Sequence, residues 1–229
     1  MIIGYGLLAN AFALNYANRL DIIIFASGVS NSQEQDLYAF QREELLLKEQ
    51  LSKHKKLVYF STCSIYDPKL CNSPYVKHKL RMEALVCKSK NYSIFRLPQV
   101  IGKTRNPNTL TNFIYNKILS GEPFHIWANA RRNLIDVLDI AKIADSILQN
   151  NEHSNSTINL ACTFSTPIID IVKIFESILD KKANYEVKND GAEYTIDTRI
   201  SSKYAKELNI DFHGIYLETV IRKYYDSSI

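Results

Sequence analysis

The chain has 229 residues, a formal net charge of +4 at pH 7, and a composition of 46% hydrophobic and 23% charged residues. This balance is typical of an ordinary soluble globular protein with one domain, or with a domain and a small subdomain. The basic residues form no long block, so a nucleic-acid partner has no support, and no apolar run is long enough to span a membrane.

The cysteines show neither a Cys-x-x-Cys motif nor a metal-like grouping with the five histidines. They are Cys63, Cys71, Cys87 and Cys162. We interpret them as free thiols of a reducing compartment and expect no metal site. The N-terminus carries no basic leader, and we therefore expect a cytoplasmic protein.

The chain begins with a short apolar strand over 1–4, which leads directly into the turn Gly4-Tyr5-Gly6-Leu7-Leu8-Ala9 and a helix over 7–18. Glycines permit a tight turn and a close approach of the backbone to a ligand. A helix that starts there offers its free amide groups to a diphosphate. Alone, this Gly-x-Gly-x-x-Ala pattern is a weak motif, but its position between a strand and a helix indicates a diphosphate-binding turn.

A second apolar strand over 21–26 ends in Ser27-Gly28, and its continuous apolar run is typical of a strand covered on both faces. A long helix over 34–52 follows, and six apolar residues are expected on its inner side. They are Leu37, Phe40, Leu45, Leu46, Leu47 and Leu51.

The third strand, over 57–60, ends in the hydroxyl residues Ser61 and Thr62. A helix is expected to start at Pro74 with Ser73 as its cap, because proline suits the first helical turn. Apolar residues at helical spacing support it; they are Val76, Leu80, Ala84 and Leu85.

Tyr75 and Lys79 are four residues apart on this helix, so their side chains point the same way. A phenol titrates near pH ~10, and a neighbouring ammonium favours the phenolate and makes the phenol a more useful acid or base. Thr62 at the strand end could hold a substrate oxygen beside them. The alternative interpretation is that Tyr75 and Lys79 form an ordinary solvated pair on a helix surface.

The rest of the chain continues to alternate strands and helices. A strand over 92–97 leads to Pro98. Further strands are expected over 124–127, 134–138 and 158–161, and helices over 110–119, 140–149 and 168–179. A mixed tail contains the segments 185–187, 196–206 and 216–225. The alternation predicts a doubly wound, Rossmann-like parallel sheet with a small mixed α/β C-terminal part. We assign 1–103 and 133–162 to the nucleotide-binding part, and 104–132 and 163–229 to a smaller substrate-binding part.

Several motifs together resemble the extended short-chain dehydrogenase/reductase superfamily, in its NAD-dependent epimerase/dehydratase branch that acts on nucleotide sugars. The segment 61–66, Ser-Thr-Cys-Ser-Ile-Tyr, looks like that family's Ser-Ser/Thr-x-x-Val-Tyr. Tyr75 and Lys79 fall on its Tyr-x-x-x-Lys. The segments 96–102 and 132–141 are similar to its Arg-Leu-x-Asn-Val-Tyr-Gly and Arg-Asp-Tyr-Val-His-Val-x-Asp-Val-Ala.

The resemblance implies a set of functional residues. The implied catalytic residues are Thr62, Tyr75 and Lys79. The implied cofactor-binding residues are Gly4, Gly6, Leu7, Leu8, Ala26, Ser27, Gly28, Ser61, Tyr75, Lys79 and Pro98. The implied substrate-binding residues are Thr62, Gln99, Asn108, Leu110 and Arg132.

It also implies NAD or NADP as the cofactor, a nucleotide sugar as the small-molecule partner, and a homodimer formed through the helices over 34–52 and 75–87.

The sequence departs from the family in two places. The family normally has a strand, a helix and a strand between its first helix and the strand placed here at 21–26, and about thirty residues, one such unit, are missing. Those strands usually support the adenosine half of the cofactor and carry the residue that separates NAD from NADP. The helix over 34–52 also lacks an Asn that is frequent there, and Gln41 is only a loose substitute.

Two functions follow. The first is an NAD(P)-dependent epimerase, dehydratase or reductase that acts on a nucleotide-activated sugar in surface polysaccharide biosynthesis. The second is a nucleotide-sugar binding or regulatory module that has lost high-affinity NAD(P) binding together with the missing strands.

Overall fold

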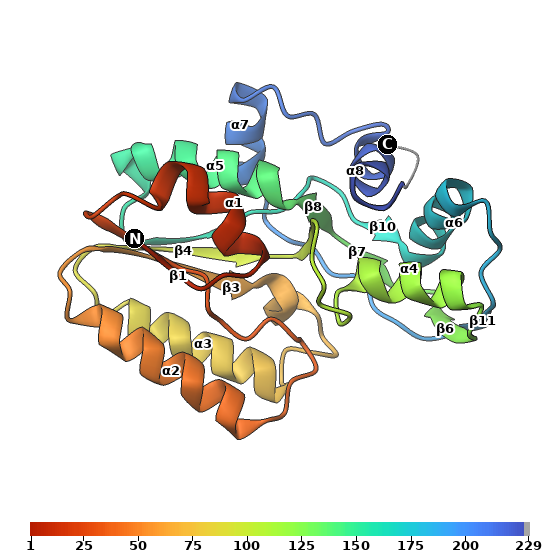
Figure 1. Cartoon of the computed structure of the whole chain (residues 1–229), viewed down its shortest axis with the longest axis horizontal. Coiled ribbons are helices and arrows are strands. Elements are labelled where there is room, and N and C mark those ends of the chain that lie inside the picture. Colours follow the sequence, from red (N-terminus) through yellow and green to blue (C-terminus); the bar gives the residue numbers. More distant parts are fainter. Residues whose placement is uncertain (227–229) are drawn as a thin grey trace.

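The computed structural model describes residues 1–226 and has a parallel five-stranded sheet with helices on both faces (Figure 1), which confirms the predicted Rossmann-like fold class. The strands of this sheet, in spatial order, are β1 (Ile2–Ile3), β2 (Ile22–Phe25), β3 (Lys56–Thr62), β4 (Tyr92–Leu97) and β9 (Ser156–Asn159). The helices are α1 (Leu7–Tyr16), α2 (Leu37–Leu51), α3 (Pro74–Val86), α4 (Leu110–Ser120), α5 (Val137–Gln149), α6 (Ile168–Leu179), α7 (Arg199–Glu207) and α8 (Tyr216–Tyr225). No helix in this part of the chain is both long and apolar enough to cross a bilayer.

Three small two-stranded sheets complete the fold. They pair β5 (Gln99–Ile101) with β8 (Leu134–Asp136), β6 (Phe124–Trp127) with β11 (Tyr185–Lys188), and β7 (Arg131–Arg132) with β10 (Thr166–Pro167).

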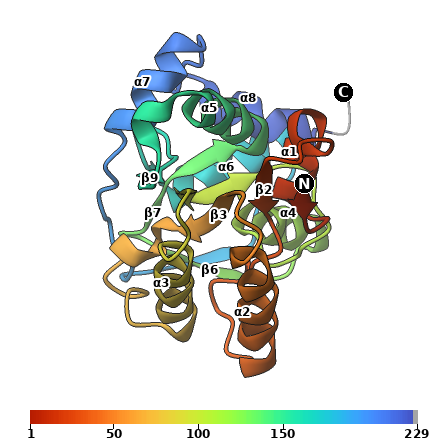
Figure 2. The same cartoon turned by 90° about the vertical axis from the view of Figure 1, so that its left-hand side faces the viewer.

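Alternate residues of each strand face opposite layers of helices. Ile22 and Ile24 point into a core shared with α1, α5 and α7, whereas Ile23 and Phe25 point into a core shared with α2 and α3. Figures 1 and 2 show α1 and α5 on one face of the sheet and α2 and α3 on the other. Burial on both faces explains why the strand at 22–25 is a continuous apolar run.

Side-chain caps fix where the helices begin. Ser73 accepts a hydrogen bond from the Val76 amide at the start of α3, beside a proline at the first helical position. Asp36 caps α2 in the same manner by accepting from the Tyr38 amide. α2 therefore begins at Leu37, three residues later than the expected start at 34.

The topology reflects the absence of the strand–helix–strand unit that the family normally has. β1 is an edge strand, and all other strands of the sheet lie on the same side of it. α1 and α2 lie on opposite faces (Figure 2), yet both carry the chain to the next strand in that same direction. Two crossover connections that step in the same direction over opposite faces of a sheet have opposite handedness. Right-handed crossovers are the rule in parallel sheets. In a doubly wound sheet, the helix on the face of α1 leads to strands beyond β1. Here the chain turns back to β2 instead.

A second apolar cluster holds α4, α6 and α8 against β6, away from the central sheet. Asp136 anchors α8 to β8, since its carboxylate accepts hydrogen bonds from Lys223 Nζ at 2.7 Å and Tyr224 Oη at 2.8 Å. Asp136 also caps α5, so this helix begins at Val137 instead of the expected residue 140. α7 packs on the sheet, where Tyr204 and Ala205 join its core although they lie beyond residue 163.

Three of the leucines expected to face inward are exposed. The exposed fraction is 71% for Leu37, 62% for Leu45 and 40% for Leu80. The buried positions of α2 include Glu43 and Gln50, and those of α3 include His78, Lys79 and Glu83. An apolar count at helical spacing missed these polar side chains because each finds a polar partner: Glu43 pairs with His78 and Lys79, and Glu83 pairs with Arg96.

Candidate active site

A cavity of about 350 Å³ lies at the carboxyl ends of β1 to β4, and residues of the loop over 104–109 also line it. This edge is where ligands bind in open α/β sheets, and the volume is in the range of small-molecule sites. Most of the predicted site residues line it. They are Gly6, Leu7, Leu8, Ala26, Gly28, Ser61, Thr62, Tyr75, Lys79, Pro98, Gln99 and Asn108.

Four predicted site residues lie outside the cavity lining: Gly4, Ser27, Leu110 and Arg132. The Ser27 hydroxyl and carbonyl accept hydrogen bonds from Arg42, at 3.2 and 3.1 Å. Leu110 packs against the apolar cluster of α4, α6 and α8. Arg132 Nη2 is 4.0 Å from an oxygen of the buried Asp67.

The two glycines of the first turn have different tasks. Gly4 has φ of +119°, and a Cβ there would lie 2.6 Å from the Ala26 carbonyl oxygen, so Gly4 allows β1 to turn against the end of β2. Gly6 has no atom within 4 Å of a Cβ position, and as the N-cap of α1 it makes no side-chain hydrogen bond to the helix. The first amides of α1 are therefore open toward the cavity, as a diphosphate would need.

Thr62, Tyr75 and Lys79 converge on the cavity as the sequence predicted. All three side chains are buried, and Lys79 Nζ lies 6.0 Å from the centre of the Tyr75 ring. Burial raises the pKa of Tyr75, while the Lys79 ammonium and a side-chain hydrogen bond with Thr62 act to lower it. The Thr62 hydroxyl also accepts from the Ser64 amide at 3.0 Å, which fixes its orientation at the strand end.

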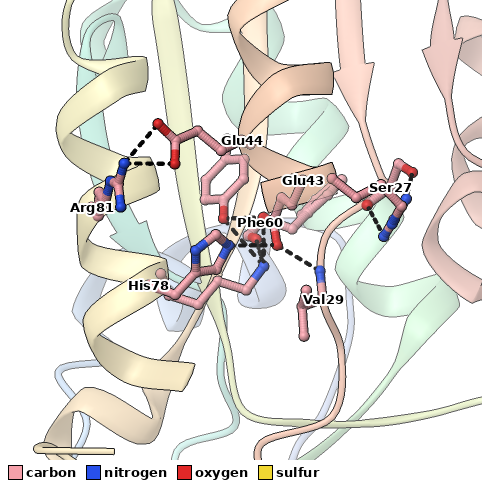
Figure 3. A network of polar contacts seen from close by, with 10 residues as sticks. Ser27, Val29, Glu43, Glu44, Phe60, His78 and Arg81 are labelled. Carbon is pink, nitrogen blue, oxygen red and sulfur yellow. Dashed lines mark hydrogen bonds and ion pairs between the residues drawn. The ribbon is translucent and has the colours of Figure 1, made fainter. Parts of the chain in front are cut away.

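Sequence reasoning missed Glu43, a carboxylate of α2 with 0% exposure that forms an ion pair with Lys79. Figure 3 shows Glu43 between His78 and Val29. One of its oxygens accepts from Lys79 Nζ at 3.1 Å and from Tyr59 Oη at 2.6 Å. The other lies 3.0 Å from His78 Nε2 and accepts from the Val29 amide at 2.6 Å. Glu43 lies three residues after Phe40 and four before Leu47, both buried, so a charge on the apolar stripe of the helix was the available signal.

Ser61 is tied to a second buried pair. Its hydroxyl donates to Glu83 at 2.5 Å, and Arg96 donates two hydrogen bonds to the same carboxylate, at 2.9 and 2.6 Å. This bidentate arrangement fastens α3 to β3 and β4. The Ser61 side chain therefore serves the scaffold of the site, although the residue lines the cavity.

The sequence model of the NAD dependent epimerase/dehydratase family matches residues 13–161. The chain belongs to this family. No curated protein matches the sequence significantly.

Solved structures show the same fold. UDP-glucuronic acid 4-epimerase from Bacillus cereus, in complex with NAD, has 18% sequence identity and a TM-score of 0.70, over 98% of this chain and 86% of that one. UDP-glucose 4-epimerase from Thermus thermophilus, in complex with NAD, has 12% identity and a TM-score of 0.70, over 98% and 84%. RMD from Pseudomonas aeruginosa, complexed with NADPH, has 12% identity and a TM-score of 0.64, over 99% and 87%.

The residues of this family member fit one half of a nicotinamide dinucleotide better than the other. The open amides after Gly6 suit the diphosphate, and the cavity beside Tyr75 and Lys79 suits the nicotinamide and its ribose. On the adenosine side, the sheet over residues 1–226 ends at β1, and no strand lies beyond it to support that half. Among the same residues, no cluster of three or more His, Cys, Asp or Glu side chains could hold a metal ion.

Proposed function

We propose that the chain is an enzyme of the nucleotide-sugar epimerase, dehydratase or reductase kind, and that it binds a nicotinamide dinucleotide and a nucleotide-activated sugar in this cavity. The observation that carries the proposal is the convergence of Thr62, Tyr75 and Lys79 on one cavity that the glycine turn also reaches. The solved structures with this fold are described as complexes with UDP-glucuronic acid and NAD, or with NADPH. A role in surface polysaccharide biosynthesis is part of the proposal.

Each side chain has a task in this chemistry. Tyr75 would give or take the proton of a sugar hydroxyl or carbonyl oxygen, and Thr62 would hold that oxygen by a hydrogen bond. Lys79 would supply positive charge beside the phenol. The bound nicotinamide would supply or accept the hydride. Gln99 and Asn108 line the cavity and would bind the sugar nucleotide.

Binding and turnover measurements test this function. The protein is titrated with NAD, NADP and UDP-glucuronic acid while its melting temperature is followed, since a ligand that binds only the folded state raises it. Turnover is then compared between the wild type, Tyr75→Phe and the control Tyr38→Phe, the same change at a side chain that is 74% exposed. We expect Tyr75→Phe alone to lose about 10²-fold or more in turnover while still binding ligand. Binding of neither dinucleotide, together with an unaffected Tyr75→Phe variant, would contradict the proposal.

The edge position of β1 favours a second candidate, a nucleotide-sugar binding or regulatory module without dinucleotide affinity. In that case UDP-glucuronic acid or a related nucleotide sugar stabilises the protein, NAD and NADP do not, and Tyr75→Phe leaves the affinity unchanged. The melting-temperature titration separates the two functions.

We also propose that the protein forms a homodimer through α2 and α3. These helices lie side by side on one face of the sheet (Figures 1 and 2) and are joined by an ion pair between Glu44 and Arg81 at 2.7 Å. Their outer surface carries exposed apolar side chains that a second copy would cover. They are Leu37, Tyr38, Leu45 and Leu80.

A further inference from the structure

The position of Glu43 has a consequence for the chemistry of Tyr75. We propose that Glu43 is a positioning residue that fixes the Lys79 ammonium and offsets its charge, so that Tyr75 meets a ligand as a neutral phenol and a proton donor. This deepens the proposed function, on which its meaning for catalysis rests. The interaction itself belongs to the ligand-free protein and can be tested there.

The first argument is the hydrogen bonding of Lys79. An ammonium has three protons to donate. Lys79 Nζ has three acceptors within the protein: Glu43 Oε1 at 3.1 Å, Tyr59 Oη at 3.1 Å and the Phe60 carbonyl oxygen at 3.4 Å. Tyr59 accepts from Lys79 and donates its own proton to Glu43, so the phenol links the two charges. The side chain that the family resemblance assigns to the cofactor ribose is thus held by the protein interior.

The second argument is the support behind Glu43. The Val29 amide donates to it from the loop after β2, and His78 reaches it from α3, as Figure 3 shows. The His78 ring stacks on Phe40 with centroids 4.6 Å apart. These contacts more than offset the cost of burial, and the pKa of Glu43 falls to about 2. Glu43 is therefore a carboxylate at neutral pH, fixed from three sides.

The third argument is steric and comes from Gly28. A Cβ at residue 28 would lie 2.7 Å from Lys79 Nζ and 2.9 Å from Glu43 Oε1. The ion pair therefore lies directly beneath the loop that lines the cavity, and a glycine at residue 28 lets the loop cross it without displacing either charged group. A pair whose only task was to join α2 to α3 would have no need to lie at the cavity wall.

The charges around Tyr75 determine in which direction its pKa should move when the charge of Glu43 is removed. Lys79 favours the phenolate, whereas Glu43 and the Cys63 thiolate form disfavour it. Glu83 on α3 acts against ionisation of the neighbouring Tyr59. Removal of the Glu43 charge leaves the Lys79 cation uncompensated beside the phenol, and the phenolate becomes easier to form. Replacement by glutamine keeps the length and an acceptor oxygen, so it changes mainly the charge.

The test is a titration of the Tyr75 phenol by ultraviolet difference absorbance in the ligand-free protein. Each background is measured with and without Tyr75→Phe, so that subtraction isolates Tyr75 from the other tyrosines of the 14 in the chain. We expect wild-type Tyr75 to titrate above the usual value of ~10. In Glu43→Gln it should titrate about one pH unit lower. Glu44→Gln is the matched control, because the next residue of α2 pairs with Lys48 and Arg81 outside the cavity.

Glu43→Asp separates charge from packing, since it keeps the carboxylate and should titrate close to the wild type. Three results would overturn the proposal: a wild-type Tyr75 that titrates at or below ~10, an unchanged Glu43→Gln, or an Asp variant that shifts as far as the Gln variant. If Glu43→Gln does not fold, the wild-type titration still decides, because a Tyr75 that titrates at or below ~10 overturns the proposal and one that titrates above it supports the proposal. Because no ligand is present, a failure of the proposed dinucleotide binding leaves these results intact, and the two ideas fail separately.

Discussion

The two glycines of the first turn provide a sharp test of the structure, because the same substitution should act on stability at one and on ligand binding at the other. Gly4→Ala places a Cβ 2.6 Å from the Ala26 carbonyl oxygen and 2.8 Å from its carbon, and it does so at φ of +119°. Both atoms belong to the backbone of the neighbouring segment, so they cannot move aside as the end of a side chain can. Gly6→Ala meets no atom within 4 Å and has φ of −83°.

The magnitudes follow from these contacts. An L-residue forced to positive φ costs about 1–3 kcal/mol, and the clash adds about 1–3 kcal/mol, so Gly4→Ala should lose about 2–6 kcal/mol of the free energy of unfolding. In a chain of this size the melting temperature should fall by roughly 4–24 °C, at about 2–4 °C per kcal/mol. Gly6→Ala should lose only about 1 kcal/mol, because alanine is the poorer N-cap but meets no steric clash at this position.

Urea unfolding followed by circular dichroism measures both free energies, with equal m-values as the check that the unfolded states are comparable. Gly6→Ala should then weaken binding of the dinucleotide about tenfold, since its methyl group projects where a diphosphate approaches the helix amides, a loss of about 1.4 kcal/mol. The reasoning fails if Gly4→Ala is as stable as the wild type, or if Gly6→Ala destabilises the protein equally.

Three further predictions address the interior and the surface. The folded pKa of Glu43 lies below its unfolded value of 4.5, at about 2, so its stabilisation is complete above pH ~4.5 and is lost as pH falls toward ~2. Between these pH values the free energy of unfolding should therefore change by on the order of 3 kcal/mol less in Glu43→Gln than in the wild type. Acid unfolding measures both, and equal changes in the two proteins would contradict the prediction. Burial raises the pKa of the Cys63 and Cys162 thiols, so mass spectrometry after alkylation of the native protein should find them unmodified, and rapid labelling of either would refute their burial. The thiols expected to react are the two less buried ones, Cys71 and Cys87. Leu45→Glu should turn a homodimer into a monomer in size-exclusion chromatography with light scattering, whereas a wild type that is already monomeric would exclude the α2–α3 interface.

The strand ends and the grouping of Thr62, Tyr75 and Lys79 could be predicted from the sequence because both depend on local patterns. An apolar run that stops at hydroxyl residues marks the carboxyl end of a strand, and Ser73-Pro74 marks a helix start, so Thr62, Tyr75 and Lys79 had to meet at one edge of the sheet. The same logic found the glycine turn. The absence of one strand–helix–strand unit was inferred by comparison with the family's usual order of elements, because the segment between the first two strands is too short to contain it.

The tertiary structure alone decided what surrounds the trio. Glu43, His78 and Tyr59 come from three elements. The spacing of α2 places Glu43 on its apolar stripe, but nothing in the sequence indicates that this carboxylate reaches Lys79. Arg132 likewise lies beside Asp67, outside the cavity lining, because β7 pairs with β10 and directs the chain there. Local patterns determine elements and their ends, whereas the charge felt by Tyr75 depends on which buried groups the packing of separate elements brings together.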